Sequence, residues 1–280
     1  MLRGLFMSWF SWFKTFSWAV YNNVQYGLTS AESCDLYLLN KGSNPAIVFI
    51  HGGGWSAGDK SAYQSLAQNC AKQGYCVVSI NFRLSDNAGT MNDWNTQLQD
   101  CQLAIRWLRQ NAATFRIDPN RIVAAGDSAG GQLALLLGML DKIATPIAGV
   151  GGRDQMLPAV SPKANMVWDM FGPTDVSIFS TVGVFSKLTP DQLAQAGPIN
   201  NVAADCAPTW ITHGTQDTVV PYQQSVALDQ KLTSLGVDHT LISYVGGHEF
   251  SGLTSSQQAA LANQALSWLS ARLHPDPSNS

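Results

Sequence analysis

The stretch GDSAGG, residues 126–131, decides how the rest of the chain is interpreted. It follows an apolar run at residues 121–125 that predicts a strand, and it opens a segment to residue 140 that predicts a helix. A G-x-S-x-G pattern in a sharp turn between strand and helix is typical of an exposed serine nucleophile. The helix that follows points free N–H groups at developing negative charge. An ordinary glycine-rich turn would explain the glycines but not this context, so we predict that Ser128 is the nucleophile.

Strand-like and helix-like segments alternate along the chain. We expect strands at residues 34–39, 46–50, 75–82, 121–125, 165–171, 209–213 and 240–245. We expect helices at residues 62–73, 94–111, 129–140, 222–235 and 255–273. Several of the strand segments are continuous apolar runs, as in strands that are covered on both faces. The sequence therefore predicts an α/β fold with a doubly wound, mostly parallel sheet and helices on both faces.

A second glycine-rich motif, HGGGW at residues 51–55, follows the predicted strand at residues 46–50. Consecutive glycines carry an entropic penalty and suit a loop whose backbone approaches a ligand closely. We predict that the N–H groups of Gly53 and Gly54, with that of Ala129, form an oxyanion hole. His51 begins this loop and is interpreted as a structural residue that braces it.

A serine hydroxyl needs a base, and the base needs an orienting carboxylate. His248 follows the last predicted strand through two glycines, so it lies at the carboxyl end of a parallel strand, where sites form. Asp217 follows the strand at residues 209–213 in the same way. The order Ser128, Asp217, His248 is that of Ser…Asp…His hydrolases. Asp175, which ends the preceding strand, is the alternative carboxylate.

With these motifs in place, the chain resembles the α/β-hydrolase superfamily. Within it, the HGGG-type loop and the GDSAGG turn resemble the hormone-sensitive-lipase-like carboxylesterases and the compact feruloyl or acetyl-xylan esterases. The segments NFRL (81–84), HGTQD (213–217) and VPY (220–222) are similar to the same groups. The resemblance runs from about residue 47 to residue 248. It implies a serine carboxylesterase that acts on short-chain acyl or aryl esters through an acyl-enzyme, without a metal or organic cofactor.

Three aromatic residues are candidates for the substrate-binding wall. Trp55 follows the glycine loop, and Trp168 and Phe171 lie at or near the end of a predicted strand. An aromatic-lined pocket would suit short acyl or aryl esters. Packing in the core is the alternative interpretation for all three residues.

Residues 1–22 carry three Trp and four Phe, and most of their apolar residues fall on one side of a helical wheel, with Met7 and Trp18 as exceptions. We therefore expect an amphipathic helix over residues 1–22, ahead of a catalytic domain at residues 23–280. Three roles stay open: a helix packed on the domain or over its site, a helix at a membrane or lipid surface, and a secretory signal. The compartment, cytoplasmic or exported, stays open with them.

The composition excludes several other classes of function. Only 12% of the 280 residues are charged, against about 25% in an average domain, and the net charge is −3. Without a block of basic residues, a nucleic-acid partner is not expected. No run of 18 apolar residues marks a membrane-spanning helix. Five cysteines without CxxC spacing predict neither a disulfide scaffold nor a zinc site, although one disulfide stays open.

Alternatives to a short-chain esterase remain at this point. An arylformamidase-like amidase would use the same residues, because acyl transfer is shared. A lipase would use residues 1–22 as an interfacial helix. A serine peptidase is disfavoured, because 280 residues leave no room for the extra domain such relatives carry. A non-catalytic binding module on the same fold would be expected to lack one of the three residues.

Overall fold

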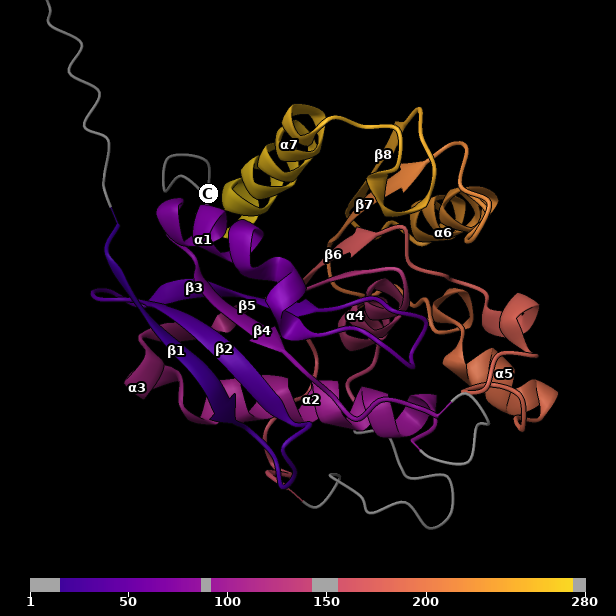
Figure 1. The fold of residues 1–280 in the computed structure, drawn as a ribbon. Helices are drawn as coiled ribbons and strands as arrows, with labels where there is room; N and C mark the ends of the chain where they lie inside the picture. The colour runs from indigo at the N-terminus through magenta and orange to yellow at the C-terminus, as the bar shows by residue number, and fades with distance from the viewer. Residues whose placement is uncertain (1–15, 87–91, 143–155, 274–280) are drawn as a thin grey trace, which may run out of the picture.

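The computed structural model describes residues 16–86, 92–142 and 156–273. Its framework is an eight-stranded sheet in the order β1-β2-β4-β3-β5-β6-β7-β8 (Figure 1). β2 runs antiparallel to both β1 and β4, and the other neighbouring strands are parallel. The strands are β1 (Trp18–Gln25), β2 (Ser33–Leu39), β3 (Asn44–Ile50), β4 (Cys76–Ile80), β5 (Ile117–Asp127), β6 (Met166–Met170), β7 (Thr209–Gly214) and β8 (His239–Tyr244). The predicted doubly wound, mostly parallel sheet is confirmed.

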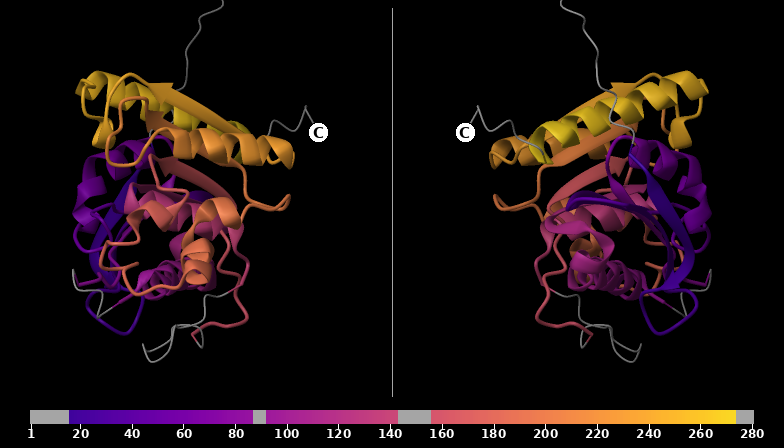
Figure 2. Two further views of the ribbon diagram at one scale, coloured as in Figure 1. Left: turned by 90° about the vertical axis from the view of Figure 1, so that its right-hand side faces the viewer. Right: turned by 90° about the vertical axis from the view of Figure 1, so that its left-hand side faces the viewer.

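Helices cover both faces of the sheet (Figures 1 and 2). α1 and α7 pack with Trp168 and Met170 on one face, and α2, α4 and α6 pack on the other. The α-helices are α1 (Gln64–Lys72), α2 (Trp94–Gln110), α3 (Ala112–Phe115), α4 (Ala129–Met139), α5 (Pro190–Ala196), α6 (Gln223–Ser234) and α7 (Ser255–Leu273). Short 3₁₀ helices are η1 (Lys60–Tyr63), η2 (Val176–Phe179), η3 (Pro198–Asn200) and η4 (His248–Phe250).

The two-sided burial follows from the strand sequences. In β3, Ile47 and Phe49 enter the core on the α1–α7 face, while Ala46, Val48 and Ile50 enter the core on the other face. Successive side chains of a strand point to opposite faces, so a continuous apolar run fills both layers. This central strand and its neighbour β5 therefore provide a rigid floor for the loops at their carboxyl ends.

The predicted helix over residues 1–22 is wrong from Trp18 onward. Residues Trp18–Gln25 form β1, an edge strand in which Trp18 pairs with Leu39 of β2. The edge of β2 supplies hydrogen-bond partners for an extended chain, and Trp18, an exception to the helical pattern, packs against the core on both faces. Pairing with β2 thus outweighs the helical spacing of the apolar residues in this segment. The predicted domain boundary between residues 22 and 23 falls inside β1. Residues 1–15 of that prediction lie outside the described part.

The described residues include all five cysteines and seven α-helices. All five cysteines are buried and free, so none of them forms the disulfide that was left open. Within residues 16–86, 92–142 and 156–273, no helix is long and apolar enough to cross a membrane.

Candidate active site

Ser128 occupies the sharp turn between β5 and α4. Its backbone has φ 49° and ψ −120°, a conformation that L-residues rarely adopt. A Cβ on Gly126 would lie 2.3 Å from the carbonyl oxygen of Gly130, and a Cβ on Gly130 would lie 2.0 Å from that of Ile50. Only glycine fits at either position. The small residues of the motif therefore allow the turn that lifts the serine hydroxyl above the sheet.

The three residues predicted to act together lie in hydrogen-bond contact. Ser128 Oγ lies 2.9 Å from His248 Nε2, and His248 Nδ1 lies 2.6 Å from Asp217 Oδ2. The three residues come from the carboxyl ends of β5, β7 and β8, and the imidazole lies between the hydroxyl and the carboxylate. This is the arrangement in which a histidine can take the serine proton while the carboxylate fixes its tautomer.

Asp217 is held in place by a network that includes a residue the sequence analysis did not single out. Its Oδ1 accepts hydrogen bonds from the backbone N–H groups of Val219 and Val220, at 2.8 and 2.9 Å. Its Oδ2 lies 3.2 Å from Nε2 of His213, a fully buried side chain in β7. His213 Nε2 also donates to the carbonyl of Val220 at 2.9 Å, and its Nδ1 accepts from Ser225 Oγ at 2.7 Å.

The partners of His213 define its protonation state. A carbonyl and a carboxylate both require a donor at Nε2, and the Ser225 hydroxyl can donate to a bare Nδ1. Burial lowers the pKa of His213, which favours the neutral ring with its proton on Nε2. His213 thus directs its Nε2–H at the carbonyl of Val220, with Asp217 Oδ2 3.2 Å from the same nitrogen. The sequence feature that could have predicted this role is the position of His213 four residues before Asp217 in the HGTQD segment.

Gly53 and Gly54 follow β3 with φ values of 114° and 58°. A Cβ on Gly53 would lie 2.3 Å from the carbonyl oxygen of Ala57, whereas a Cβ on Gly54 would meet no atom within 4 Å. Both glycines line a cavity together with Ser128. Among the hydrogen bonds of the described chain, none uses the N–H of Gly53, Gly54 or Ala129. These groups are available for a developing oxyanion, as the sequence analysis expects.

Hydrogen bonds and ring stacking fix the glycine loop, residues 51–55, to the neighbouring elements. Asp127 accepts a hydrogen bond from the backbone N–H of Gly52 at 2.9 Å and another from the hydroxyl of Tyr63. The ring of His51 stacks on Phe82, with centroids 4.6 Å apart, and its Nδ1 donates to the carbonyl of Gly52 at 2.8 Å. His51 therefore braces the loop, as predicted. Asp127 ties the loop to the turn that carries Ser128.

The cavity above Ser128 has a volume of about 510 Å³, and we call it the Ser128 cavity. Trp55 forms part of its wall, as predicted, and its indole donates a hydrogen bond to Gln132 at 2.9 Å. The rings of Phe179 and Phe185 meet Trp55 edge-on, at 5.8 and 4.7 Å. The remaining lining residues are Gly53, Gly54, Pro173, Val182, Val219, Val220, His248 and Glu249.

The other two aromatic candidates do not line the Ser128 cavity. Trp168 points to the α1–α7 face of the sheet, because it shares the alternation of Met166 and Met170 along β6. Phe171 is buried behind His248, where its ring lies 4.9 Å from the imidazole. The prediction that Trp168 and Phe171 form part of the wall beside Ser128 therefore does not match their positions in the structure. Phe171 instead packs against the imidazole, and Trp168 packs on the α1–α7 face of the sheet.

The alternative carboxylate has a different task. Asp175 caps the 3₁₀ helix η2 by accepting a hydrogen bond from the N–H of Ser177 at 2.9 Å. It therefore does not take the place of Asp217 beside His248. In the described residues, no group of three or more His, Cys, Asp or Glu side chains is placed to hold a metal ion.

The BD-FAE family model matches residues 34–232, well over half of the chain. The chain belongs to the BD-FAE family. The match includes the HGGG loop, the GDSAGG turn and Asp217, but ends before His248.

Relatives of this BD-FAE protein are named as esterases. Esterase LipC of Mycobacterium tuberculosis is 25% identical over 78% of this chain and 56% of its own length. The isoprenylcysteine α-carbonyl methylesterase of Arabidopsis thaliana is 25% identical over 88% of this chain and 60% of its own length. The chain thus spans about half the length of the curated relatives it matches.

Solved structures confirm the α/β-hydrolase fold of the BD-FAE protein. A truncated carbohydrate esterase from gut microbiota superposes with a TM-score of 0.76 and 28% identity, covering 91% of this chain and 98% of that one. The propionate-bound esterase 2 of Thermogutta terrifontis superposes with a TM-score of 0.71 and 22% identity, covering 94% and 96%. The second likeness bears on the fold alone.

Proposed function

We propose that this protein is a serine carboxylesterase that hydrolyses small, uncharged esters. The proposal depends above all on one observation. The Ser128 hydroxyl lies 2.9 Å from an imidazole that contacts a buried carboxylate at 2.6 Å, at the floor of an open cavity. The esterase names of the relatives support the same reaction class.

In the first half of the reaction, His248 Nε2 takes the Ser128 proton as Oγ attacks the ester carbonyl carbon. The carbonyl oxygen becomes an oxyanion that the N–H groups of Gly53, Gly54 and Ala129 stabilise. Removing one such donor costs about 3–4 kcal/mol of transition-state stabilisation in comparable hydrolases. The bond to the leaving alcohol then breaks, His248 returns the proton to the alcohol oxygen, and the acyl group stays on Ser128 Oγ.

In the second half, water replaces the alcohol. His248 takes a proton from the water as its oxygen attacks the acyl carbon, and the oxyanion forms in the same place. The bond to Ser128 Oγ breaks, the proton returns to that oxygen, and the carboxylic acid leaves. Throughout, Asp217 keeps the proton on His248 Nδ1 and stabilises the imidazolium. This carboxylate takes no proton itself.

The walls of the Ser128 cavity favour short acyl groups on uncharged alcohols. Trp55, Phe179, Val182 and Val219 give it an apolar lining, and the indole of Trp55 is fixed by Gln132 and by two neighbouring rings. We expect this apolar, fixed wall to favour a short, uncharged acyl group. Because the carbohydrate esterase from gut microbiota superposes on nearly the whole chain, we include esters of carbohydrate hydroxyls in the proposed substrate class.

A substrate panel tests the proposal. We expect turnover of 4-nitrophenyl acetate and butyrate, a fall of kcat/KM for 4-nitrophenyl laurate, and release of acetate from acetylated xylan. An N-formyl anilide run beside them separates an esterase from an amidase. Faster cleavage of the anilide than of the acetate would contradict an esterase. A preference for laurate would contradict the short-chain substrate class and indicate a lipase.

A further inference from the structure

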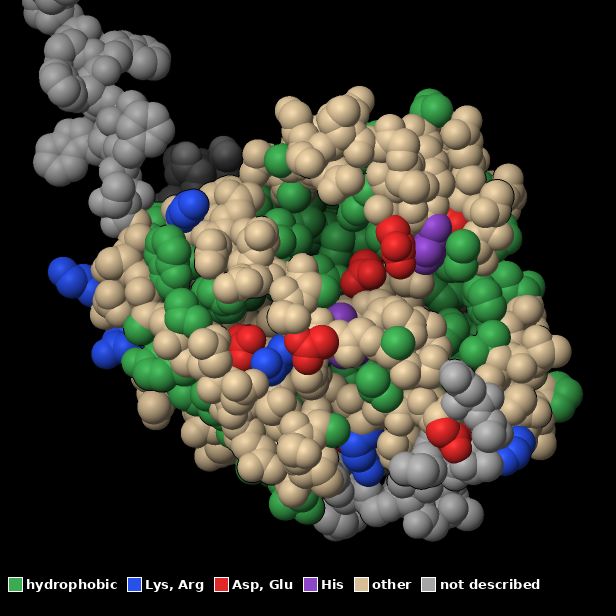
Figure 3. Space-filling view, in the orientation of Figure 1, with side chains coloured by type: hydrophobic (Ala, Val, Ile, Leu, Met, Phe, Trp, Pro, Cys, Tyr) green, Lys and Arg blue, Asp and Glu red, His purple; other side chains and the backbone are tan. Residues whose placement is uncertain are grey.

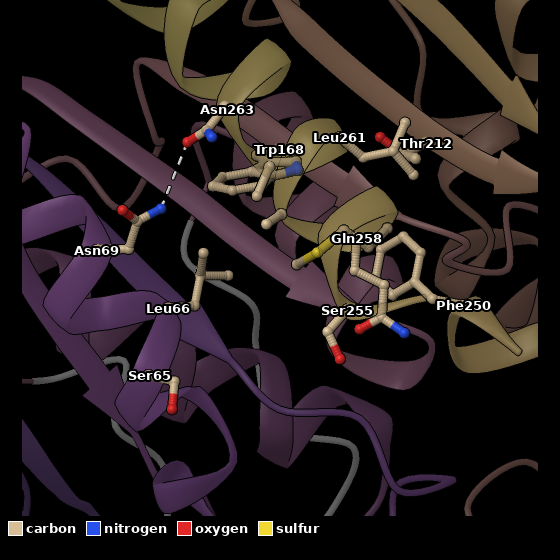
Figure 4. A pocket seen from close by; sticks show the side chains of 13 residues that line it. Ser65, Leu66, Asn69, Trp168, Thr212, Phe250, Ser255, Gln258, Leu261 and Asn263 are labelled. Carbon is tan, nitrogen blue, oxygen red and sulfur yellow. Dashed lines mark hydrogen bonds between the residues drawn. The ribbon is translucent and has the colours of Figure 1, made fainter. Parts of the chain in front are cut away.

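A second cavity lies between α1 and α7, on the sheet face opposite α4 (Figure 4). We call it the α1–α7 cavity. Its volume is about 390 Å³, within the usual range for small-molecule sites. Trp168 and Met170 of β6 and Thr212 of β7 form its floor, and Phe250 of η4 closes one end. In space-filling view, a hollow lined by apolar side chains opens between these two helices (Figure 3).

The lining of the α1–α7 cavity is uncharged. None of its residues is Asp, Glu, Lys, Arg or His. The interior is apolar, with the indole of Trp168 and the ring of Phe250, while the amides of Asn69, Gln258 and Asn263 stand at the edges contributed by α1 and α7 (Figure 4). A charged ligand would lose its hydration here without gaining an opposite charge. A flat, uncharged ligand with hydrogen-bonding groups would match both the interior and the edges.

One polar group inside the cavity has no partner. Trp168 is 2% exposed, yet its indole N–H donates no hydrogen bond to any residue in the described ranges. Its neighbour Trp210, by contrast, donates to Thr212 Oγ1 at 2.8 Å. The indole N–H groups that are both buried and unpaired in the described residues are those of Trp94 and Trp268, so the Trp168 N–H is unpaired but accessible from the cavity that Trp168 lines. An acceptor on a bound ligand would satisfy the Trp168 donor.

We propose that the α1–α7 cavity is a second binding site, which takes an uncharged aromatic small molecule with a hydrogen-bond acceptor. The Trp168 indole and the Phe250 ring contact the aromatic body, and the Trp168 N–H donates to the acceptor. The rim amides then contact the polar end of the ligand.

The position of Phe250 connects this site to Ser128. Phe250 and His248 belong to the same three-residue element, η4, in which Glu249 and Phe250 both have positive φ values, 55° and 57°. Phe171 lies between the two side chains, with its ring 5.0 Å from that of Phe250 and 4.9 Å from His248. A ligand that packs against Phe250 therefore bears, through Phe171, on the imidazole that lies 2.9 Å from Ser128 Oγ. This second part, a fall in turnover when the site is filled, rests on the proposed esterase function.

Calorimetric titration of the full chain with 2-naphthol tests binding without reference to turnover. This probe is aromatic, uncharged near pH 7 and carries a hydroxyl oxygen as acceptor. Ala259 lines the cavity from α7, so Ala259→Trp fills it, whereas the neighbouring exposed Ala260 lines a different surface and Ala260→Trp serves as the matched control. We expect one site in the wild type and in Ala260→Trp, and at least tenfold weaker binding in Ala259→Trp. Absence of binding to the wild type, or equal binding by all three proteins, overturns the proposal.

Trp168→Phe tests the unpaired N–H with little change of shape. Loss of one hydrogen bond predicts about 2- to 12-fold weaker binding of 2-naphthol, with naphthalene, which has no acceptor, as the reference ligand. Naphthalene affinity is expected to stay the same in the two proteins. An equal loss for both ligands would show that packing, not the N–H donor, is responsible, and would contradict this part of the assignment.

Turnover of 4-nitrophenyl acetate tests the connection to Ser128. Saturating 2-naphthol is expected to lower kcat by about fivefold or more in the wild type and in Ala260→Trp, but not in Ala259→Trp. A rise in KM alone, equal in all three proteins, would mean competition in the Ser128 cavity and would contradict the connection. If the protein does not turn over esters at all, the proposed function fails while the calorimetric result still decides the site.

Discussion

At Ser128 the backbone holds a conformation that is costly for any residue with a side chain. Its N–H donates to the carbonyl of Met170 at 2.9 Å, and the glycines at positions 126 and 130 leave room for the carbonyl oxygens that approach them. Strain of this kind persists only where the surroundings fix it, and it concentrates at functional sites. The geometry of residue 128 therefore supports the nucleophile over an ordinary turn residue.

His213 is expected to act as a positioning residue for Asp217. His213→Leu removes the Nε2–H donor, and loss of one hydrogen bond, about 0.5–1.5 kcal/mol, predicts a fall of kcat by about 2- to 12-fold. KM is expected to stay unchanged, because His213 is fully buried and does not line the Ser128 cavity. Steady-state kinetics with 4-nitrophenyl acetate checks both values.

His213→Gln provides the matched control, because its amide N–H can replace the Nε2 donor. Partial recovery of kcat relative to His213→Leu is the expected result. If both variants lose activity equally while remaining folded, the Nε2 donor is not what supports Asp217.

Among the structural elements, the loop after β3 offers a sharp comparison between two adjacent glycines. Gly53→Ala places a methyl group 2.3 Å from the carbonyl oxygen of Ala57, whereas Gly54→Ala places it in open space. Overpacking costs about 1–3 kcal/mol, which corresponds to about 2–12 °C in Tm for a chain of this size. Thermal melts are expected to show the larger fall for Gly53→Ala. The reverse order would contradict the loop geometry.

The elements that sequence reasoning identified best are those with strong local signals. In the turn at residues 126–131 and the loop at residues 51–55, glycines are required by backbone atoms close to them. Asp217 and His248 follow the neighbouring parallel strands β7 and β8, whose carboxyl ends lie side by side. The sequence could not predict which face of the sheet each β6 side chain points to, because a strand that is apolar on both faces has no polar face to set its orientation. Trp168 was misplaced for that reason. His213 was missed because its hydrogen bonds depend on the fold of the loop after β7.

At the scale of the whole molecule, the aromatic N-terminal region shows that a helical spacing of apolar residues does not by itself predict a helix. A helical stripe predicted residues 1–22 as one unit, but Trp18–Gln25 belong to the sheet. The hydropathy and helix propensity of residues 1–22 carry no information about the edge of β2, which offers unpaired backbone groups to another strand. The pairing of residues 18–21 with residues 36–39 could be recognised only in the folded molecule.

The contribution of β1 to stability can be measured by comparing a chain that begins at Phe16 with one that begins at Tyr26. Loss of a large packed side chain such as Trp18 removes about 1.5–3 kcal/mol, so Tm of the shorter chain is expected to be about 3–12 °C lower. Because both chains lack residues 1–15, the comparison isolates the edge strand. Equal melting temperatures would contradict the packing of Trp18 against the core.

The buried, neutral His213 also predicts a pH dependence of stability. Burial lowers its pKa in the folded protein below the unfolded value of about 6.5, so protonation favours the unfolded chain. Its stabilising contribution is complete above that unfolded value and is lost as the pH falls below it. Gln at this position does not titrate. The Tm advantage of the wild type over His213→Gln is therefore expected to shrink between pH 7.5 and pH 5, and a constant difference would mean that His213 is not held neutral.

If Ser128 carries the acyl group, replacing its hydroxyl must abolish turnover. The measurement is kcat/KM for 4-nitrophenyl acetate in Ser128→Ala and in the wild type, with a thermal melt of each to show that both are folded. We expect a loss of about 10⁴-fold or more, because neither His248 nor the N–H groups of the glycine loop can replace the nucleophile. A folded Ser128→Ala protein that retains activity within tenfold of the wild type would contradict this role of Ser128.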